Sequence, residues 1–223
     1  RIMGLPSLLM ARLLELAGPL KSLLGHRYLR LRLLQMVLMQ LGSGWESVQD
    51  SFMIAVLGWE PGDWDLVNVP ISSSREVWGM LTSGMMVQWA ADSANRYWYV
   101  KANLAFGSVM LLLQNFAPFG AAFMLIPRCL LALCPGDGGA EAAFFSSQLP
   151  GDVQASANGL LTATDNLVSG FGRWLYARFL FDPSARGWEA AVPLLARTCF
   201  TLLGNMICFY CWWRYDRADH KKD

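Results

Sequence analysis

Charged and amide side chains stand inside stretches of the sequence that are otherwise apolar. Glu46 and Asp50 are four residues apart, so a helix would place both on one face, with Gln49 beside them. A charged group inside an apolar segment is costly unless it is paired, and such groups often belong to a functional site. The candidate polar site therefore comprises six residues: Glu46, Gln49, Asp50, Arg128, Asp165 and Arg173.

Three of these residues are expected at a similar height along their helices. Asp50, Arg128 and Arg173 each follow the basic end of their segment by about 20 residues, or roughly 30 Å at the rise of an α-helix. We hypothesise that Asp50 pairs with Arg128 or with Arg173. Such a pair could form part of a functional site, or could do no more than fix the packing of the helices.

The sequence offers little for catalysis or metal binding. Its two histidines are His26 and His220, and it has no H-E-x-x-H, Walker or G-x-G-x-x-G motif. We therefore expect no enzyme, no catalytic residue, no metal, and no cofactor other than bound lipid. His26 could ligate a pigment magnesium, although a plain interfacial histidine is favoured. Cys208 and Cys211 form a C-x-x-C within an apolar run, which is more typical of buried cysteines than of a redox or metal site.

The composition indicates which solvent surrounds these residues. Of the 223 residues, 54% are hydrophobic and 16% are charged, and the mean hydropathy is +0.31. Soluble domains carry about 25% charged residues, so the composition predicts an integral membrane protein. At about 20 residues per transmembrane helix, the length allows six spans with little left over. The net charge of +1 offers no basic surface for nucleic acid.

Hydropathy and turn residues divide the chain into three parts. Residues 1–27 predict an amphipathic interfacial helix and a basic linker. Residues 28–214 predict an all-α bundle of six transmembrane helices, and 215–223 form a polar tail. The expected spans are 31–57, 77–91, 100–116, 119–148, 153–181 and 190–213.

The tripeptide Pro-Gly-Asp hints at an internal repeat. It follows the first span at 61–63 and the fourth span at 150–152, as expected if two sets of three spans are built alike. A third copy at 135–137 has no place in such a repeat. Small residues in the first and fifth spans predict close helix packing; they are Gly42, Ser43, Gly44, Gly159, Ser169, Gly170 and Gly172.

Charged residues and tryptophans predict the orientation of the bundle. Lysines and arginines gather before the first span, near 96–101 and after the sixth span, whereas acids dominate the opposite loops. Because basic loops stay on the cytoplasmic side, both termini of this multi-pass chain are expected on the cytoplasmic-equivalent side. Six tryptophans are expected to form two interfacial belts: Trp59, Trp64 and Trp188 on one side, and Trp98, Trp212 and Trp213 on the other.

Two loops carry motifs of a known family. The first span ends with VLGWEPGDWD at 56–65, a Gly-Trp and a short Pro-containing turn. After the second span, Asp92 and Arg96 match the family pattern G-x-L-x-D-R-x-G-R. Gln88 and Ser93 stand where that pattern has Gly and Arg.

A third motif lies at 149–161, after the fourth span. There Pro150, Gln154 and Gly159 fall in the pattern P-x-x-x-Q/R-G-x-x-x-G. On these three stretches the chain resembles the C-terminal six-helix half of a major facilitator superfamily transporter, of the tetracycline-resistance type. The resemblance covers about residues 28–214.

This resemblance implies a half-bundle built from two three-helix repeats, whose first, second, fourth and fifth helices line a central cavity. The polar site would then bind a small solute or carry a proton, and Asp92 and Arg96 would form the helix-latch loop. A transport pathway lies between two such bundles. The lipid bilayer and a second six-helix bundle are therefore the expected partners. That bundle could come from a second copy, a partner chain or a preceding half, because the chain begins at Arg1.

A second interpretation stays open at this point. The chain could be a non-transporting, transporter-derived structural subunit of a multisubunit membrane complex, for example a photosynthetic or respiratory one. The single half-bundle, the replaced latch residues and the aromatic-rich flanks favour it. Its partners would be other membrane subunits, and pigments if the complex is photosynthetic.

Overall fold

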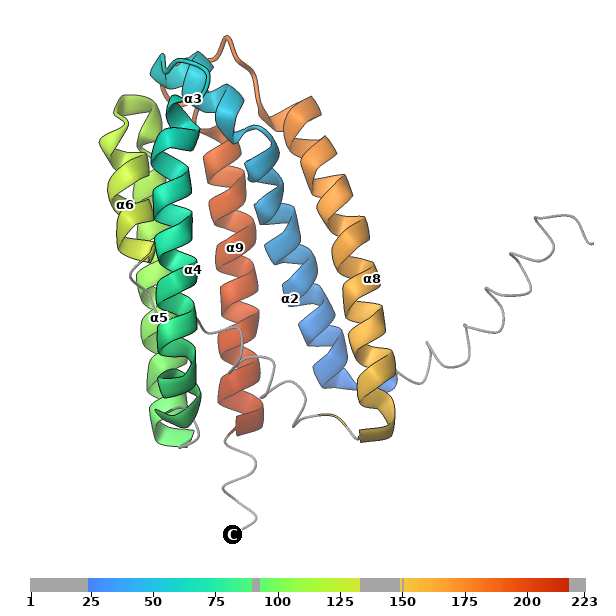
Figure 1. Cartoon of the computed structure of the whole chain (residues 1–223). Coiled ribbons are helices and arrows are strands. Elements are labelled where there is room, and N and C mark those ends of the chain that lie inside the picture. The colour runs from blue at the N-terminus through green and yellow to red at the C-terminus, as the bar shows by residue number, and fades with distance from the viewer. Residues whose placement is uncertain (1–23, 90–92, 133–148, 150, 217–223) are drawn as a thin grey trace, which may run out of the picture.

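The computed structural model describes residues 24–89, 93–132, 149 and 151–216. These residues form seven α-helices and no strand, so the all-α prediction is confirmed (Figure 1). The α-helices are α2 (Arg27–Ser43), α3 (Gln49–Leu57), α4 (Asp63–Trp89), α5 (Ser93–Gln114), α6 (Ala122–Ala132), α8 (Gly151–Leu175) and α9 (Val192–Cys211). Short 3₁₀ turns are η1 (Gly44–Ser47) and η2 (Ala117–Phe119), and π turns are η3 (Tyr176–Leu180) and η4 (Trp212–Asp216). The expected interfacial helix lies outside the described residues.

Three of the predicted spans differ from the observed helices, the third because α5 begins at Ser93 and not at residue 100. The first is interrupted by η1, so it consists of α2 and α3. The second begins at Asp63 and not at residue 77, because a polar helical face was read as a loop. Its start is fixed locally: the Asp63 carboxylate accepts the Glu60 backbone N–H at 2.9 Å, and Gly62 takes a positive φ of 97°.

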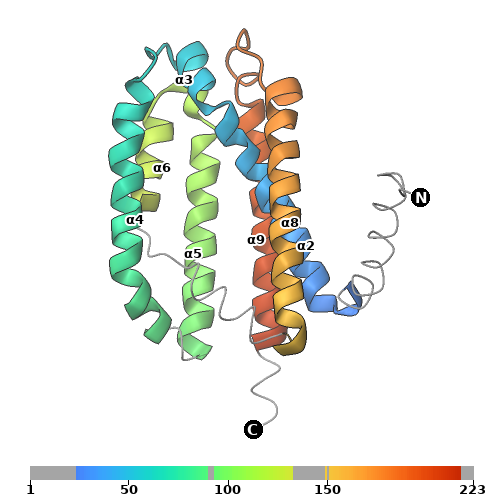
Figure 2. The ribbon, with the colours of Figure 1, turned by 45° about the vertical axis from the view of Figure 1, so that its right-hand side comes forward.

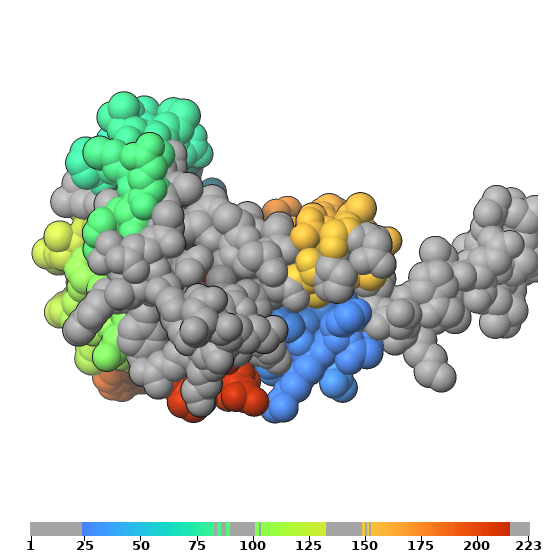
Figure 3. Space-filling view, turned by 90° about the horizontal axis from the view of Figure 1, so that it is seen from below, coloured from blue at the N-terminus to red at the C-terminus, as the bar shows by residue number. Residues whose placement is uncertain are grey.

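The helices pack in a regular pattern. The α2 helix packs against α8 and α9, whereas α6 packs against α4 and α5, and α5 joins the two groups by packing against α9. Figure 2 shows α4 and α6 on one side of the molecule and α2 and α8 on the other. Seen from the end opposite α3, the described parts of α4 and α5 stand apart from those of α2 and α8 (Figure 3). The helices can be counted as six segments: α2 with α3, then α4, α5, α6, α8 and α9. The first segment packs against the fifth and sixth, and the fourth segment packs in the same way against the second and third.

Glycines allow α2 and η1 to lie close against α8 and α9. A Cβ added at Gly44 would lie 2.5 Å from the Gly172 carbonyl carbon, and one at Gly42 would lie 2.8 Å from Thr201 Oγ1. The predicted close packing is thus confirmed at Gly42, Gly44 and Gly172. The prediction of close packing is wrong for Gly159 and Gly170, because a Cβ added at either position would have no neighbouring atom within 4 Å.

Apolar side chains fill the interior and also cover much of the outside. Trp45, Phe52 and Tyr176 are fully buried near α3. On the outer faces, Leu66 and Leu167 are each 77% exposed. Within the described residues, one helix is long and apolar enough to cross a membrane, Val192–Arg214, and two shorter apolar helical stretches are Leu104–Gln114 and Ala122–Ala132.

The connection between η3 and α9 lies at the same end of the bundle as α3 (Figure 1). Asp182 accepts hydrogen bonds from the Ser184 hydroxyl at 2.7 Å and from its backbone N–H at 2.8 Å. These two bonds hold the pKa of Asp182 below its usual range. Trp188 in the same connection lies edge-on to Phe116 and Phe119, with centroid distances of 5.5 and 5.0 Å.

The Gly44 contact can be tested by adding one methyl group. Gly44→Ala is expected to destabilise the protein by about 1–3 kcal/mol, because the Gly172 backbone cannot move aside as a side chain would. Gly170→Ala is the matched control, since its Cβ meets nothing within 4 Å and alanine favours a helix. Thermal unfolding of both variants in detergent measures the difference. Equal midpoints for the two variants would contradict the close contact.

Candidate functional site

The interruption of the first helix positions three of the predicted site residues. At its end, the Ser43 hydroxyl donates to the Gln40 carbonyl at 2.9 Å, and the Ser47 hydroxyl donates to the Gly44 carbonyl at 2.8 Å. Ser47 also reaches the Arg173 carbonyl of α8 at 3.3 Å, which ties the turn to the neighbouring helix. As a result Glu46 lies within η1, and Gln49 and Asp50 begin α3. A short 3₁₀ stretch inside a helix often marks a functional position.

The first half of α4 presents a polar face to this turn. Asp65, Asn68 and Ser72 follow one another at helical spacing, and Arg75 and Glu76 continue the same face. The Ser72 hydroxyl donates to the Asn68 side-chain oxygen at 3.3 Å. None of these five residues is among the six candidates predicted from the sequence. Their spacing of three to four residues, which indicates a shared polar face of a helix, is the signal that identifies them.

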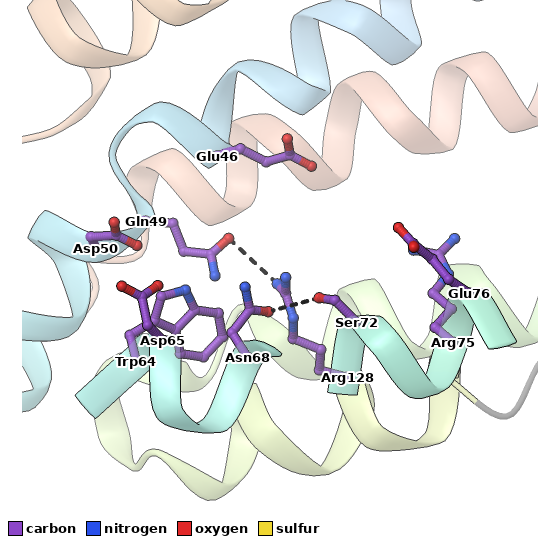
Figure 4. A pocket seen from close by; sticks show the side chains of 10 residues that line it. All are labelled: Glu46, Gln49, Asp50, Trp64, Asp65, Asn68, Ser72, Arg75, Glu76 and Arg128. Atoms are coloured by element: carbon purple, nitrogen blue, oxygen red, sulfur yellow. Dashed lines mark hydrogen bonds between the residues drawn. The ribbon is translucent and has the colours of Figure 1, made fainter. Parts of the chain in front are cut away.

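A pocket lies between η1, α3, α4 and α6, and its volume is about 570 Å³. Figure 4 shows the polar face of α4 opposite the side chains of η1 and α3, with Arg128 of α6 between them. Four of the six predicted site residues line it, together with six that were not predicted. The lining residues are Glu46, Gln49, Asp50, Trp64, Asp65, Asn68, Ser72, Arg75, Glu76 and Arg128.

Arg128 is held in the pocket by two side chains. Its guanidinium carbon lies 4.8 Å from the centroid of the Trp64 ring, within the range of a cation–π contact. Its Nη1 donates to Gln49 Oε1 at 3.4 Å. With the Gln49 amide turned by 180°, its oxygen accepts from both Trp64 Nε1 at 3.0 Å and Arg128 Nη1 at 3.2 Å. Gln49 and Trp64 are both buried, so the guanidinium rests on fixed neighbours.

The acids of the pocket do not neutralise this guanidinium by direct contact. Among the described residues, Arg128 forms no ion pair with Glu46, Asp50 or Asp65. The expected pairing of Asp50 with Arg128 or Arg173 is thus not present as a direct contact, although Asp50 and Arg128 share the pocket. Glu46 is close enough for its charge to act on Arg128, and its side chain is exposed. The pocket therefore holds separated charges of both signs.

The other two predicted site residues lie elsewhere. Asp165 and Arg173 belong to α8, which does not line the pocket. Arg173 is exposed and Asp165 is half-buried. The latch residue Asp92 lies outside the described residues, and the side chain of Arg96, in α5, is also not described.

The candidate pigment ligand and the C-x-x-C also have clear places. His26 is half-buried directly before α2, where its carbonyl accepts the Arg30 backbone N–H at 3.2 Å. Cys208 and Cys211 are both buried and form no disulfide, which confirms the interpretation as buried cysteines. In the part of the chain that the structure describes, no group of three or more histidine, cysteine or acidic side chains is placed to hold a metal ion.

A second polar contact joins α5 to α9. Arg197 Nη1 donates to Gln114 Oε1 at 2.6 Å, and the Thr198 hydroxyl donates to Asn115 Oδ1 at 3.0 Å. Gln114, Asn115 and Thr198 are all buried. Because these buried side chains are hydrogen-bonded to one another, we interpret the contact as structural. It stabilises the junction between the two groups of helices.

Comparison of the chain with known proteins supplies no family. No protein-family model matches it, and neither the curated proteins nor the solved structures give a significant match. The function must therefore be argued from the pocket and from the surface that surrounds it.

Proposed function

We propose that this chain is an integral membrane protein that provides one six-helix half of a unit for transporting a small solute. The support for the membrane comes first from the surface. Large apolar side chains are exposed on α4, α6, α8 and α9, among them Met80 at 70%, Ile126 at 58% and Met206 at 66%. In water such a surface would aggregate or need a partner, whereas lipid solvates it. The helix Val192–Arg214 adds to this support.

The packing supports a three-plus-three organisation. The first segment of each set of three packs against the second and third segments of the other set, as expected for two related halves of a bundle. Pro-Gly-Asp also leads into corresponding helices, since α4 begins at Asp63 and α8 at Gly151. Both observations agree with the resemblance to a facilitator half.

The charges support the orientation. Figure 1 shows the start of α2 and the end of α9 at one end of the bundle, and α3 with the η3–α9 connection at the other. Arg27 and Arg214 lie at the first end, whereas the second end carries Glu60, Asp63 and Asp182 together with Arg178 and Arg186. Trp188 stacks with exposed Phe116 and Phe119 at that second end, as an interfacial aromatic cluster would.

The observation that carries the transport proposal is the pocket at Arg128. Charged groups inside an apolar bundle are costly, and they are retained where they face water or a substrate. Here the charged groups line one pocket between η1 and α3 of the first segment, α4 and α6. The corresponding first, second and fourth helices line the cavity in the resembled family. The second wall of a pathway would come from another six-helix bundle.

The structural-subunit interpretation also has one observation in its favour. Phe171, Trp174 and Phe179 form an exposed aromatic row along α8 and η3, with centroid distances of 5.5 and 5.1 Å. Such a row could pack against a neighbouring subunit. It does not account for the pocket charges, which form no ion pair with Arg128 among the described residues, so transport is the better supported function.

Cysteine labelling in vesicles tests the membrane placement. Cys129 and Cys199 are exposed on the bundle, so lipid should shield both from a membrane-impermeant maleimide. Asn68→Cys in a cysteine-free background should react, because Asn68 lines the pocket. We expect rates that differ by roughly tenfold or more, since a thiol must be hydrated to form the reactive thiolate. Reaction of a restored Cys199 as fast as that of the introduced cysteine would contradict the membrane placement.

Uptake by proteoliposomes tests transport. The protein, with any subunits that purify with it, is supplied with labelled amino acids, organic cations and carboxylates. Arg128→Gln should reduce uptake by roughly tenfold or more, because the amide lacks the charge that the pocket presents to a solute. Arg186→Gln is the matched control, since Arg186 donates to the Pro183 and Ala185 carbonyls of its own loop and does not line the pocket. Uptake no greater than in empty liposomes for every solute would favour the structural subunit.

A further inference from the structure

We propose that the pocket at Arg128 binds a small zwitterion, a solute that carries both a carboxylate and an ammonium group. This inference rests on the proposed function and names the substrate class of the same site. It follows from the kinds of charge in the pocket, from how they are held and from a lining that is mostly polar.

The positive part of the pocket is prepared for a carboxylate. A guanidinium offers five N–H donors in a planar fork that matches two carboxylate oxygens. Arg128 uses one of them on Gln49, and its face rests on Trp64. Within the described chain no acid pairs with it, so donors remain for a ligand. The fixed neighbours reduce the entropy that Arg128 would lose on binding.

The negative part of the pocket is prepared for an ammonium group. Glu46, Asp50 and Asp65 come from three different elements, and all three are exposed into open space. In Figure 4 Glu46 faces Arg128 across the pocket, and Asp50 and Asp65 lie toward one end. Several carboxylates from different directions suit a compact ammonium ion, which donates three hydrogen bonds.

The charges of the pocket disfavour the simpler ligands. The lining contains four carboxylates and two guanidinium groups, which gives a net charge of −2 when all are ionised. A plain anion would be repelled by this net charge, and a plain cation would leave the remaining N–H donors of Arg128 without an acceptor on the ligand. A zwitterion satisfies both parts at once.

The uncharged residues that line the pocket favour a small polar solute over an apolar one. Asn68 and Ser72 supply amide and hydroxyl groups on the α4 wall, and among the described residues Trp64 is the one large apolar side chain that lines the pocket. The volume of about 570 Å³ exceeds what a small amino acid fills, which leaves room for water or for side chains of an opposing bundle.

Binding measurements with matched ligands test this inference. The probes are the ω-amino acids from glycine to 6-aminohexanoate, with butyrate and butylamine as single-charge counterparts of 4-aminobutyrate. Calorimetry on the purified protein should show binding of at least one ω-amino acid. Butyrate and butylamine should bind roughly tenfold more weakly or worse, because each leaves one set of charges unmatched.

A pair of variants makes the result specific. Arg128→Gln should weaken the zwitterion and leave butylamine unchanged or tighter, whereas Glu46→Gln should weaken both ammonium-bearing ligands. Such opposite changes in selectivity cannot arise from a folding defect, and Arg186→Gln should change neither ligand. Equal binding of butylamine and 4-aminobutyrate, equal binding of butyrate, or no binding across the series would each overturn the inference.

The same ligands separate this inference from the proposed function. Zwitterion binding without uptake in proteoliposomes would support the site and contradict transport. Uptake of other solutes without zwitterion binding would support transport and overturn the substrate class.

Discussion

The close approach of two backbones at Gly44 and Gly172 is the constraint on which the site depends. Side chains at either position would push η1 away from α8, and the turn would lose the bond from Ser47 to the Arg173 carbonyl. Because the helix is interrupted there, Glu46 and the start of α3 turn toward α4 and α6. If α2 continued as a straight helix, Glu46 and Asp50 would stay on the helix that packs against α8 and α9. Their charges would then lie next to a tightly packed interface.

Two sets of polar side chains in the bundle have different surroundings. Between α5 and α9, Arg197 and Thr198 have neutral hydrogen-bond partners on the facing helix, so their burial is satisfied internally. Around Arg128 the charges stay separate and face open space. The contrast matters because an apolar exterior gives these charges no other solvent, so a function that admits water or a solute accounts for them.

The sequence predicts the helices well and the site in part. Apolar runs and the Pro-Gly-Asp turns locate most helical segments, because these patterns are local. Glu46 and Asp50 were found through their shared helix face, but Arg173 was misplaced. Arg173 lies beside the η1 turn, where its carbonyl accepts the Ser47 hydroxyl, but its neighbour Gly172 faces α2 and η1, and the Arg173 side chain is exposed. The start of α4 is not predicted, because polar residues alternate there with apolar ones such as Leu66 and Val69 and leave no continuous apolar run.

We propose that the polar pocket at Arg128 faces a second bundle across a water-accessible space. An experimental structure of the protein, purified from its native membrane into lipid nanodiscs, would test it most directly. The account predicts a second six-helix bundle opposite α2, α4, α6 and α8, with ordered water or a small solute beside Arg128. Pigments, lipids or an unrelated subunit packed into that face, with Arg128 paired to them, would contradict it.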